Sequence, residues 1–329
     1  MASIAARAAA SVTGRSTTRA ILVSLVLLAT ACLHNTLDSA SESQTVVHAM
    51  TVDHNTRTYR LHLPTHLTPH EHLPLVIVLH GHGDNAQDFE ASTGMSDKAD
   101  TEHFIAIYPQ AMGNPSDWHS AVDGPADKAD VDFVHEIIHT MIEQYHVDRT
   151  RIFVAGHSNG GFMAYRIASL LSNDIAAVGV TAGSIGSIDK QGDTIRISQP
   201  RRPVAVIHFH GYADPSVPYE GGDEDDGPDN IVSAPNTVHF WVTADGCPAT
   251  PTRVISSNKN VIVDSYTPCA LGTAVVFYTI VDGQHRWPGD DIPWWTFPNR
   301  EITDVDATNV MWDFFRAHPK SNSANTTNR

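Results

Sequence analysis

Short apolar runs alternate with longer segments of helical periodicity along most of the chain. The short runs are rich in β-branched residues and end at glycine, proline or polar residues, which is typical of buried strands. We expect strands at 46–52, 57–63, 75–79, 104–108, 151–155, 176–181, 204–208 and 273–280. Apolar residues spaced three and four apart predict helices at 131–145, 160–171, 231–244 and 305–317. Strands that alternate with helices favour an α/β fold with a mostly parallel central sheet flanked by helices.

The segment 151–165 carries the clearest chemical signal. It places G-x-S-x-G, from Gly156 to Gly160, between a predicted strand and a predicted helix. A serine at such an elbow sits on strained backbone, with its hydroxyl above the sheet edge and the next N–H free for an oxyanion. Ser158 is therefore the predicted nucleophile. The rest of the chain must supply a base, an acid and a second oxyanion donor.

The second oxyanion donor is expected after the buried run 75–79. That run ends in His80-Gly81-His82-Gly83, where glycines allow a tight turn close to a ligand. In α/β-hydrolases the loop at this place supplies one oxyanion N–H, and the residue after the nucleophile supplies the other. We expect the backbone N–H groups of His82 and Asn159 to fill these roles.

The acid and the base follow two later strands. Asp214 comes just after the run 204–208, and His285 comes just after the run 273–280. Serine becomes a good nucleophile only when a neutral imidazole takes its proton, and a carboxylate must orient that imidazole. Ser158, Asp214 and His285 thus form the predicted catalytic triad, in the chain order Ser, Asp, His. Two simpler interpretations stay open here, a turn residue at Asp214 and a surface loop histidine at His285.

Five sequence blocks resemble those of a known family. They are LHGHGDNAQDF, ADVDF beginning at Ala129, GHSNGG, HFHGYADPSVPY and DGQHRWPG. In this order they are similar to blocks of the polyhydroxybutyrate depolymerase and feruloyl esterase family of secreted α/β-hydrolases, from about residue 45 to residue 319. The resemblance implies the α/β-hydrolase fold and ester hydrolysis, and it assigns the triad positions to the three residues above.

The resemblance also suggests that Trp118 and Trp287 line the acyl pocket. One departure from the family is visible, because Asp282-Gly283-Gln284 precedes the histidine where the family usually has a run of glycines. This difference concerns the shape of the rim of the site rather than the triad.

Composition is that of one exported globular domain. The chain has 329 residues, of which 41% are hydrophobic, enough for one large core. The formal net charge of -16 argues against a nucleic-acid partner, which requires a basic patch. We expect an exposed linker at 32–44, a catalytic domain at 45–319 and a disordered tail at 320–329. The protein is expected to be a monomer that needs no cofactor or metal and binds an oligomeric or polymeric ester.

The first 31 residues are typical of a bacterial export signal. Arg7, Arg15 and Arg19 precede the apolar run 20–28, which is too short to span a membrane, and small residues lead to Cys32. A cysteine in this place indicates lipidation, although Ala29 stands where leucine is commoner, and plain cleavage is the alternative. Either outcome puts the protein outside the cytoplasm, secreted or held in the cell envelope by a lipid anchor.

Cys247 and Cys269 are the remaining two of three cysteines. An even pair in an oxidising compartment predicts a disulfide, worth about 3 kcal/mol by chain-entropy reasoning. It would brace the segment before the strand that carries His285. Two separate buried thiols are the alternative.

Two other patterns suggest metal binding. Residues 135–139 read HEIIH, a literal H-E-x-x-H zinc-protease motif. Helical register argues against it, because the two histidines and the glutamate oppose an apolar stripe formed by Val134, Ile137, Ile138, Met141, Ile142 and Tyr145. No third ligand is identified, and Ile142 occupies the place of a required glycine. The acidic loop 220–230 lacks EF-hand spacing, so a solvated loop is favoured over a calcium site.

These observations predict an exported serine carboxylic ester hydrolase that acts through an acyl-enzyme. We expect hydroxyalkanoate esters, such as 3-hydroxybutyrate oligomers or polymer, as substrates. Soluble oligomers are favoured over crystalline polymer, since no polymer-gripping domain is expected after Pro319. The alternative is a feruloyl or acetyl esterase on plant polysaccharide. More remote alternatives are the zinc metalloprotease and a catalytically inactive binding lipoprotein.

Overall fold

The computed structural model describes residues 44–68, 71–120, 128–188, 192–222, 230–289 and 305–321. The predicted export signal, Cys32 and most of the linker, acidic loop and tail lie outside these residues. Within the described ranges, no helix is both long enough and apolar enough to cross a membrane.

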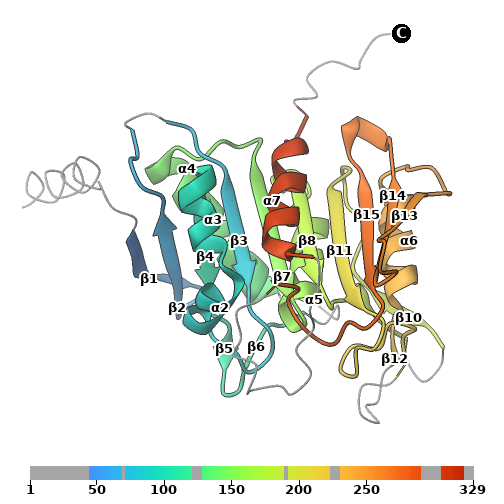
Figure 1. Cartoon of the computed structure of the whole chain (residues 1–329). Coiled ribbons are helices and arrows are strands. Elements are labelled where there is room, and N and C mark those ends of the chain that lie inside the picture. Colours follow the sequence, from blue (N-terminus) through green and yellow to red (C-terminus); the bar gives the residue numbers. More distant parts are fainter. Residues whose placement is uncertain are drawn as a thin grey trace, which may run out of the picture. The chain divides into compact units, whose positions relative to one another are not determined.

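A ten-stranded sheet forms the centre of the catalytic domain (Figure 1). Its strands lie in the order β1 (Gln44–Val52), β2 (Asn55–Leu63), β4 (Ile105–Pro109), β3 (Leu75–Leu79), β7 (Ile152–His157), β8 (Ala177–Thr181), β11 (Ala205–Gly211), β15 (Val275–Ile280), β14 (Val261–Tyr266) and β13 (Thr252–Ile255). The strands from β4 to β15 pair in parallel, and antiparallel strands extend the sheet at both edges. The mostly parallel sheet predicted from the sequence is confirmed.

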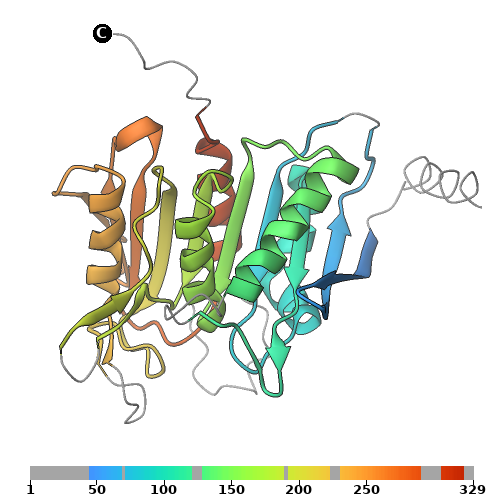
Figure 2. The same cartoon turned by 180° about the vertical axis from the view of Figure 1, so that it is seen from behind.

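Helices cover both faces of the sheet (Figures 1 and 2). One face carries α2 (Ala86–Thr93), α3 (Met95–Glu102) and α7 (Ala307–Ala317), and the other carries α4 (Ala129–Tyr145), α5 (Asn159–Leu170) and α6 (Ala234–Ala244). Alternate strand residues enter the two apolar cores, so that Ile77 packs on one side and Val76 on the other. Because both faces are buried, the central strands appear in the sequence as continuous apolar runs.

Several elements were not expected from the sequence. Helices α2 and α3 are short and mostly polar, and only a few residues such as Phe89 and Met95 reach the core, so no apolar stripe revealed them. Strands β13 and β14 lie at an edge, and every residue of β13 is exposed. Short strands β5 (Met112–Gly113), β6 (Ser116–Asp117), β9 (Gly186–Ile188), β10 (Thr194–Arg196) and β12 (Asn230–Ile231) and the 3-10 turn η2 (Ala270–Gly272) complete the described elements.

Helix boundaries follow their caps. Helix α6 begins three residues later than predicted, because the Ser233 side chain accepts a hydrogen bond from the N–H of Asn236 and ends the preceding extended segment. Helix α7 begins after Asp306, whose carboxylate accepts from the N–H of Asn309 in the same way.

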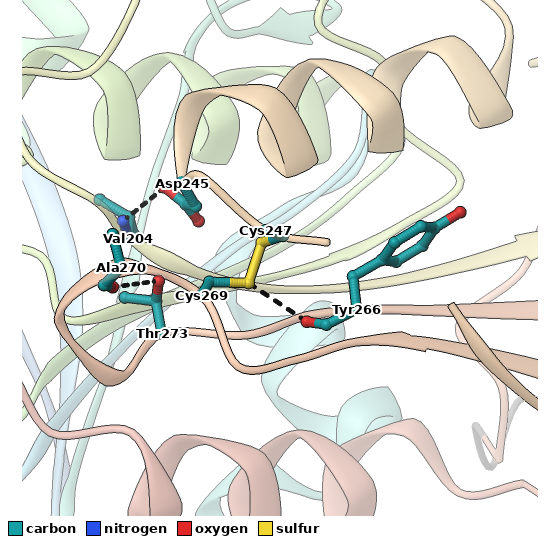
Figure 3. The surroundings of a disulfide bond; sticks show 7 residues. All are labelled: Val204, Asp245, Cys247, Tyr266, Cys269, Ala270 and Thr273. Atoms are coloured by element: carbon teal, nitrogen blue, oxygen red, sulfur yellow. Dashed lines mark hydrogen bonds between the residues drawn. A yellow bond between two sulfur atoms is a disulfide. The ribbon is translucent and has the colours of Figure 1, made fainter. Parts of the chain in front are cut away.

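A disulfide joins Cys247 to Cys269, 22 residues apart in sequence, as the cysteine count predicts (Figure 3). Cys247 follows α6, and Cys269 precedes η2 and the entry into β15. Next to the bridge, the N–H of Ala270 donates to the carbonyl of Asp245, 2.9 Å away. The bridge therefore ties the end of α6 to the segment that leads into the strand before His285.

Candidate active site

Ser158 occupies a strained turn between β7 and α5. Its backbone has φ 53° and ψ −127°, a conformation that residues with a side chain rarely adopt. The turn is possible because Gly156 and Gly160 lack side chains, since a Cβ on Gly156 would collide with the Gly160 carbonyl and one on Gly160 with the carbonyls at the end of β3. The N–H of Ser158 donates to Thr181 O in β8 at 3.0 Å. The elbow is thus fixed to the sheet on both sides.

Three strand ends bring Ser158, Asp214 and His285 together. His285 Nε2 lies 2.9 Å from Ser158 Oγ, and its Nδ1 lies 2.9 Å from Asp214 Oδ2. A carboxylate only accepts, so Nδ1 carries the hydrogen and Nε2 accepts from the serine hydroxyl. The loops that bear the last two residues are also joined directly, because the N–H of Ala213 donates to Gly283 O at 2.9 Å.

Asp214 is held in one orientation. Its side chain has no exposed surface, and its Oδ1 accepts hydrogen bonds from the N–H groups of Ser216 and Val217, both at 2.9 Å. With Oδ1 occupied in this way, Oδ2 points to His285. The histidine side chain is 20% exposed, so part of the imidazole reaches solvent.

The expected oxyanion donors lie beside the elbow. Asn159 is the first residue of α5, where a helix provides no acceptor for the N–H. Gly81 packs against Ser158, since a Cβ on this glycine would lie 3.4 Å from that of the serine. Within the described residues, neither the backbone N–H of His82 nor that of Asn159 has a hydrogen-bond acceptor. Both groups are available for a ligand oxygen.

A buried histidine orients the first of these donors. His80 Nδ1 donates to the carbonyl of Gly81 at 2.8 Å, and its Nε2 accepts from the N–H of Ala111 at 3.1 Å. Burial lowers the pKa of His80, which favours this neutral tautomer. Because C=O and N–H point in opposite directions across a trans peptide, holding the Gly81 carbonyl also sets the direction of the His82 N–H.

His157, the residue before Ser158, lies against His285. Its ring centroid is 4.8 Å from that of His285, and its Nδ1 forms a 2.8 Å hydrogen bond with Thr181 Oγ1. Burial and the neighbouring His285 hold the pKa of His157 well below its usual value. A neutral ring therefore packs beside His285 without adding a charge. No local sequence pattern marks His80 or His157, since their contacts come from segments distant in sequence.

The two tryptophans expected at the acyl pocket are buried. Trp118 is 1% exposed, and its indole N–H donates to His80 O at 2.9 Å. Trp287 is 3% exposed, donates to Thr308 Oγ1 at 3.0 Å and packs edge-on against Phe89. In this structure each supports neighbouring parts of the site and offers almost no surface to a ligand, unlike the pocket-lining residues that we expected.

The H-E-x-x-H segment lies on α4, away from these strand ends. Ile137, Ile138 and Met141 are buried, whereas Glu136 and His139 are exposed, as the helical register predicts. His135 and His139 contact each other with ring centroids 4.7 Å apart. Among the described residues, no three His, Cys, Asp or Glu side chains are grouped as metal ligands.

Comparisons with known proteins point to esterases. Residues 57–211 match the family model described as esterase PHB depolymerase. NocK of Nocardia uniformis subsp. tsuyamanensis, which bears the name of an esterase, is 28% identical over 280 residues, 77% of each chain. Feruloyl esterase B of Piromyces equi is 27% identical over 239 residues, 71% of this chain but only 43% of that protein.

A solved structure shares the fold. The acetyl xylan esterase from Aspergillus awamori superposes with a TM-score of 0.58 over 84% of this chain and 99% of that one, at 13% sequence identity. At this identity the likeness shows the architecture alone, which is the α/β-hydrolase fold expected from the elbow and the sheet. The family resemblance drawn from the five sequence blocks is confirmed by the matched family model.

Proposed function

We propose that the chain, which is similar to polyhydroxybutyrate depolymerases and feruloyl esterases, hydrolyses carboxylic esters through an acyl-enzyme on Ser158. The observation that carries this proposal is the continuous hydrogen-bonded series from Ser158 Oγ through His285 to Asp214. It lies at a strained elbow beside two backbone N–H groups that have no acceptor within the described residues.

The geometry supports the following reaction. His285 Nε2 takes the hydroxyl proton as Ser158 Oγ bonds to the ester carbonyl carbon, and the Asp214 carboxylate stabilises the imidazolium. The carbonyl oxygen becomes an oxyanion between the N–H groups of His82 and Asn159. When the intermediate collapses, the C–O bond to the alcohol breaks and the imidazolium gives its proton to the departing oxygen. A water then repeats the sequence, which releases the acid and restores the serine.

For the substrate we propose esters of hydroxyalkanoates, with oligomers of 3-hydroxybutyrate as the representative. The description of the matched family model supports this choice. Feruloyl or acetyl esters of plant polysaccharide are the second candidate, supported by the names of the feruloyl esterase and the acetyl xylan esterase. We also propose that the protein is exported and contacts the membrane only through a lipid on Cys32.

One experiment tests both levels of the proposal. A fluorophosphonate should label the protein at Ser158, and the Ser158→Ala variant should take no label. Turnover is then measured on a 3-hydroxybutyrate trimer and on methyl ferulate. Labelling at another residue would overturn the acyl-enzyme. A kcat/KM for methyl ferulate more than about tenfold above that for the trimer would select the second candidate, since tenfold corresponds to about 1.4 kcal/mol of transition-state discrimination.

A further inference from the structure

Three buried side chains form a series of hydrogen bonds that the proposed reaction does not use. Tyr165 Oη lies 2.7 Å from His208 Nδ1, His208 Nε2 lies 3.0 Å from His210 Nδ1, and His210 Nε2 lies 2.8 Å from Val217 O. All three side chains are at most 2% exposed. The series starts on α5, the helix that follows the nucleophile, crosses β11 and ends in the turn that carries Asp214.

The direction of every hydrogen bond in this series is determined. A carbonyl can only accept, so His210 Nε2 carries a hydrogen and donates to Val217. Burial lowers the pKa of His210 and holds that of His208 well below its usual value, which favours the neutral form of both rings at neutral pH. His210 Nδ1 therefore accepts from His208 Nε2, and His208 Nδ1 accepts from the Tyr165 hydroxyl. All three donors point toward the acid turn.

The last member of the series acts on the residues that orient the acid. Val217 accepts from His210 through its carbonyl and donates through its own N–H to Asp214 Oδ1 at 2.9 Å. His210 Nε2 also lies 3.7 Å from Asp214 Oδ2, the oxygen that binds His285. The N–H of His210 Nε2 thus holds the turn in place and faces Oδ2, the carboxylate oxygen that contacts His285.

We propose that His210 is a positioning residue for the triad acid, and that Tyr165 and His208 hold it in the tautomer that donates to Val217. This inference rests on the proposed function. His210 lies behind Asp214 and acts through the turn, so its role is to keep the carboxylate within hydrogen-bonding distance of His285 as charge develops there. A shift of the reacting groups by about 1 Å is enough to lower a rate by about 100-fold.

Two polar substitutions separate the donor from the ring. In His210→Gln the amide nitrogen reaches the position of Nε2 and can donate to Val217, whereas in His210→Asn the shorter amide occupies the position of Nδ1 and cannot. We expect His210→Asn to lower kcat on a soluble ester by about 10- to 100-fold with KM within about twofold, the range typical of lost outer hydrogen-bond partners. His210→Gln should recover most of this loss. Tyr165→Phe should lower kcat by about two- to fivefold, since its effect passes through two further hydrogen bonds.

A spectroscopic measurement makes the test specific to positioning. The proton between His285 Nδ1 and Asp214 gives a low-field proton resonance, which should broaden or move upfield in His210→Asn and return in His210→Gln. His62→Leu is the matched control, because it removes another buried, hydrogen-bonded histidine, on β2. It should leave both kcat and this resonance unchanged.

Several results would overturn the proposal. One is a folded His210→Asn protein with wild-type kcat and an unshifted resonance, and another is His210→Gln with the same kcat as His210→Asn. If His210→Asn does not fold, Tyr165→Phe provides the test instead. Wild-type kcat with an unshifted resonance in Tyr165→Phe would then overturn the proposal. Failure of the proposed function is distinguishable from these results, because the Ser158→Ala variant would then still hydrolyse the ester.

Discussion

Strand β11 has a buried aspartate at each of its ends. Asp214 follows its carboxyl end, and Asp245 accepts a 3.1 Å hydrogen bond from the N–H of Val204, the residue before its amino end. The Asp214 residue is 6% exposed and Asp245 is 0% exposed. The same residue type, buried to a similar extent, has different partners at the two ends.

The number of hydrogen-bond donors separates the two carboxyl groups. Asp214 receives two backbone N–H groups on Oδ1 and the His285 ring on Oδ2, so both of its oxygens have a partner. Asp245 receives one N–H, and among the described residues its Oδ2 has no partner. Burial raises the pKa of Asp245 to about 7. At Asp245 the single donated hydrogen bond does not offset the burial that opposes the charged form.

The residues around the two ends of β11 also differ. At the carboxyl end, the loops after β7, β11 and β15 bring Ser158 and Asp214 into contact with His285. The His285 side chain is partly exposed. At the amino end, the disulfide (Figure 3) joins two segments without any reactive arrangement. The hydrogen bond from the Ala270 N–H to the Asp245 carbonyl joins the same segments. We therefore expect substitutions at the first end to change rate and those at the second to change stability.

The largest expected effect is at the carboxyl end. Ser158→Ala or His285→Ala should lower kcat on a soluble ester by about a million-fold, and the double variant should be scarcely worse, because the two groups act as a unit. Steady-state kinetics measure the rates, and thermal unfolding should show little change in Tm. Near-normal turnover in Ser158→Ala, or losses that multiply in the double variant, would contradict the triad.

Asp214→Asn should have the next largest effect. The amide keeps the shape of the carboxylate but cannot stabilise the imidazolium, and it stabilises the wrong tautomer of His285, so we expect kcat to fall by about 10,000-fold. Asp245→Asn is the matched control at the other end of the strand, with turnover unchanged. Equal losses of turnover in the two variants would show that the aspartates at both ends of β11 affect the rate, contrary to our expectation.

The elbow and the meeting of Ser158, Asp214 and His285 could be predicted from the sequence because their signals are local. Gly156 and Gly160 mark the turn around Ser158, and strand runs directly before Asp214 and His285 mark positions at one sheet edge. Parallel strands place such positions together without further information.

The supporting residues could not be predicted in this way. His80, His157 and His210 look like any other histidine in the sequence, and their roles depend on contacts with residues distant in the chain, such as Ala111 and Thr181. Helices α2 and α3 escaped prediction because packing of a few apolar side chains stabilises them rather than a periodic stripe. The buried positions of Trp118 and Trp287 likewise depend on tertiary contacts that no local pattern reveals.

Removal of the disulfide should affect the amino end alone. A Cys247→Ser, Cys269→Ser double variant should lose about 2 to 5 kcal/mol of unfolding free energy, because the open chain gains conformational freedom when unfolded. Urea unfolding measures this loss. Activity should decline at lower temperature than in the wild type, while the cold, folded enzyme keeps nearly its full kcat. Inactivation of a still folded variant would show that the bridge acts on the site itself, and two thiols that titrate in the native protein would exclude the bond.

Asp245→Asn tests the charge at the amino end. The ordinary pKa of 3.8 rises to about 7 in the folded protein, so the stability contributed by the bound proton is full below about pH 4 and is lost as the pH rises through about 7. Asparagine does not titrate. The wild type should therefore lose up to about 4 kcal/mol relative to the variant between about pH 4 and pH 7.5. Burial lowers the pKa of Lys320 to about 8, so the comparison stays below that pH. A difference in stability that does not change with pH would show that folding leaves the pKa of Asp245 at its unfolded value.

The smallest effect is expected on α4, which contributes to neither end of β11. His135→Ala with His139→Ala removes the histidines of the H-E-x-x-H segment from a helix face where Glu136 and His139 are exposed and the apolar stripe lies on the opposite side. Substitutions at exposed positions without special contacts usually change stability by less than about 0.5 kcal/mol, so ester hydrolysis should stay within about threefold of the wild type. A chelator should leave kcat unchanged in both proteins. Stoichiometric zinc in the purified protein, with ester hydrolysis lost on its removal and in the double variant, would move the catalytic centre to α4 and would leave the arrangement around Ser158 without a function.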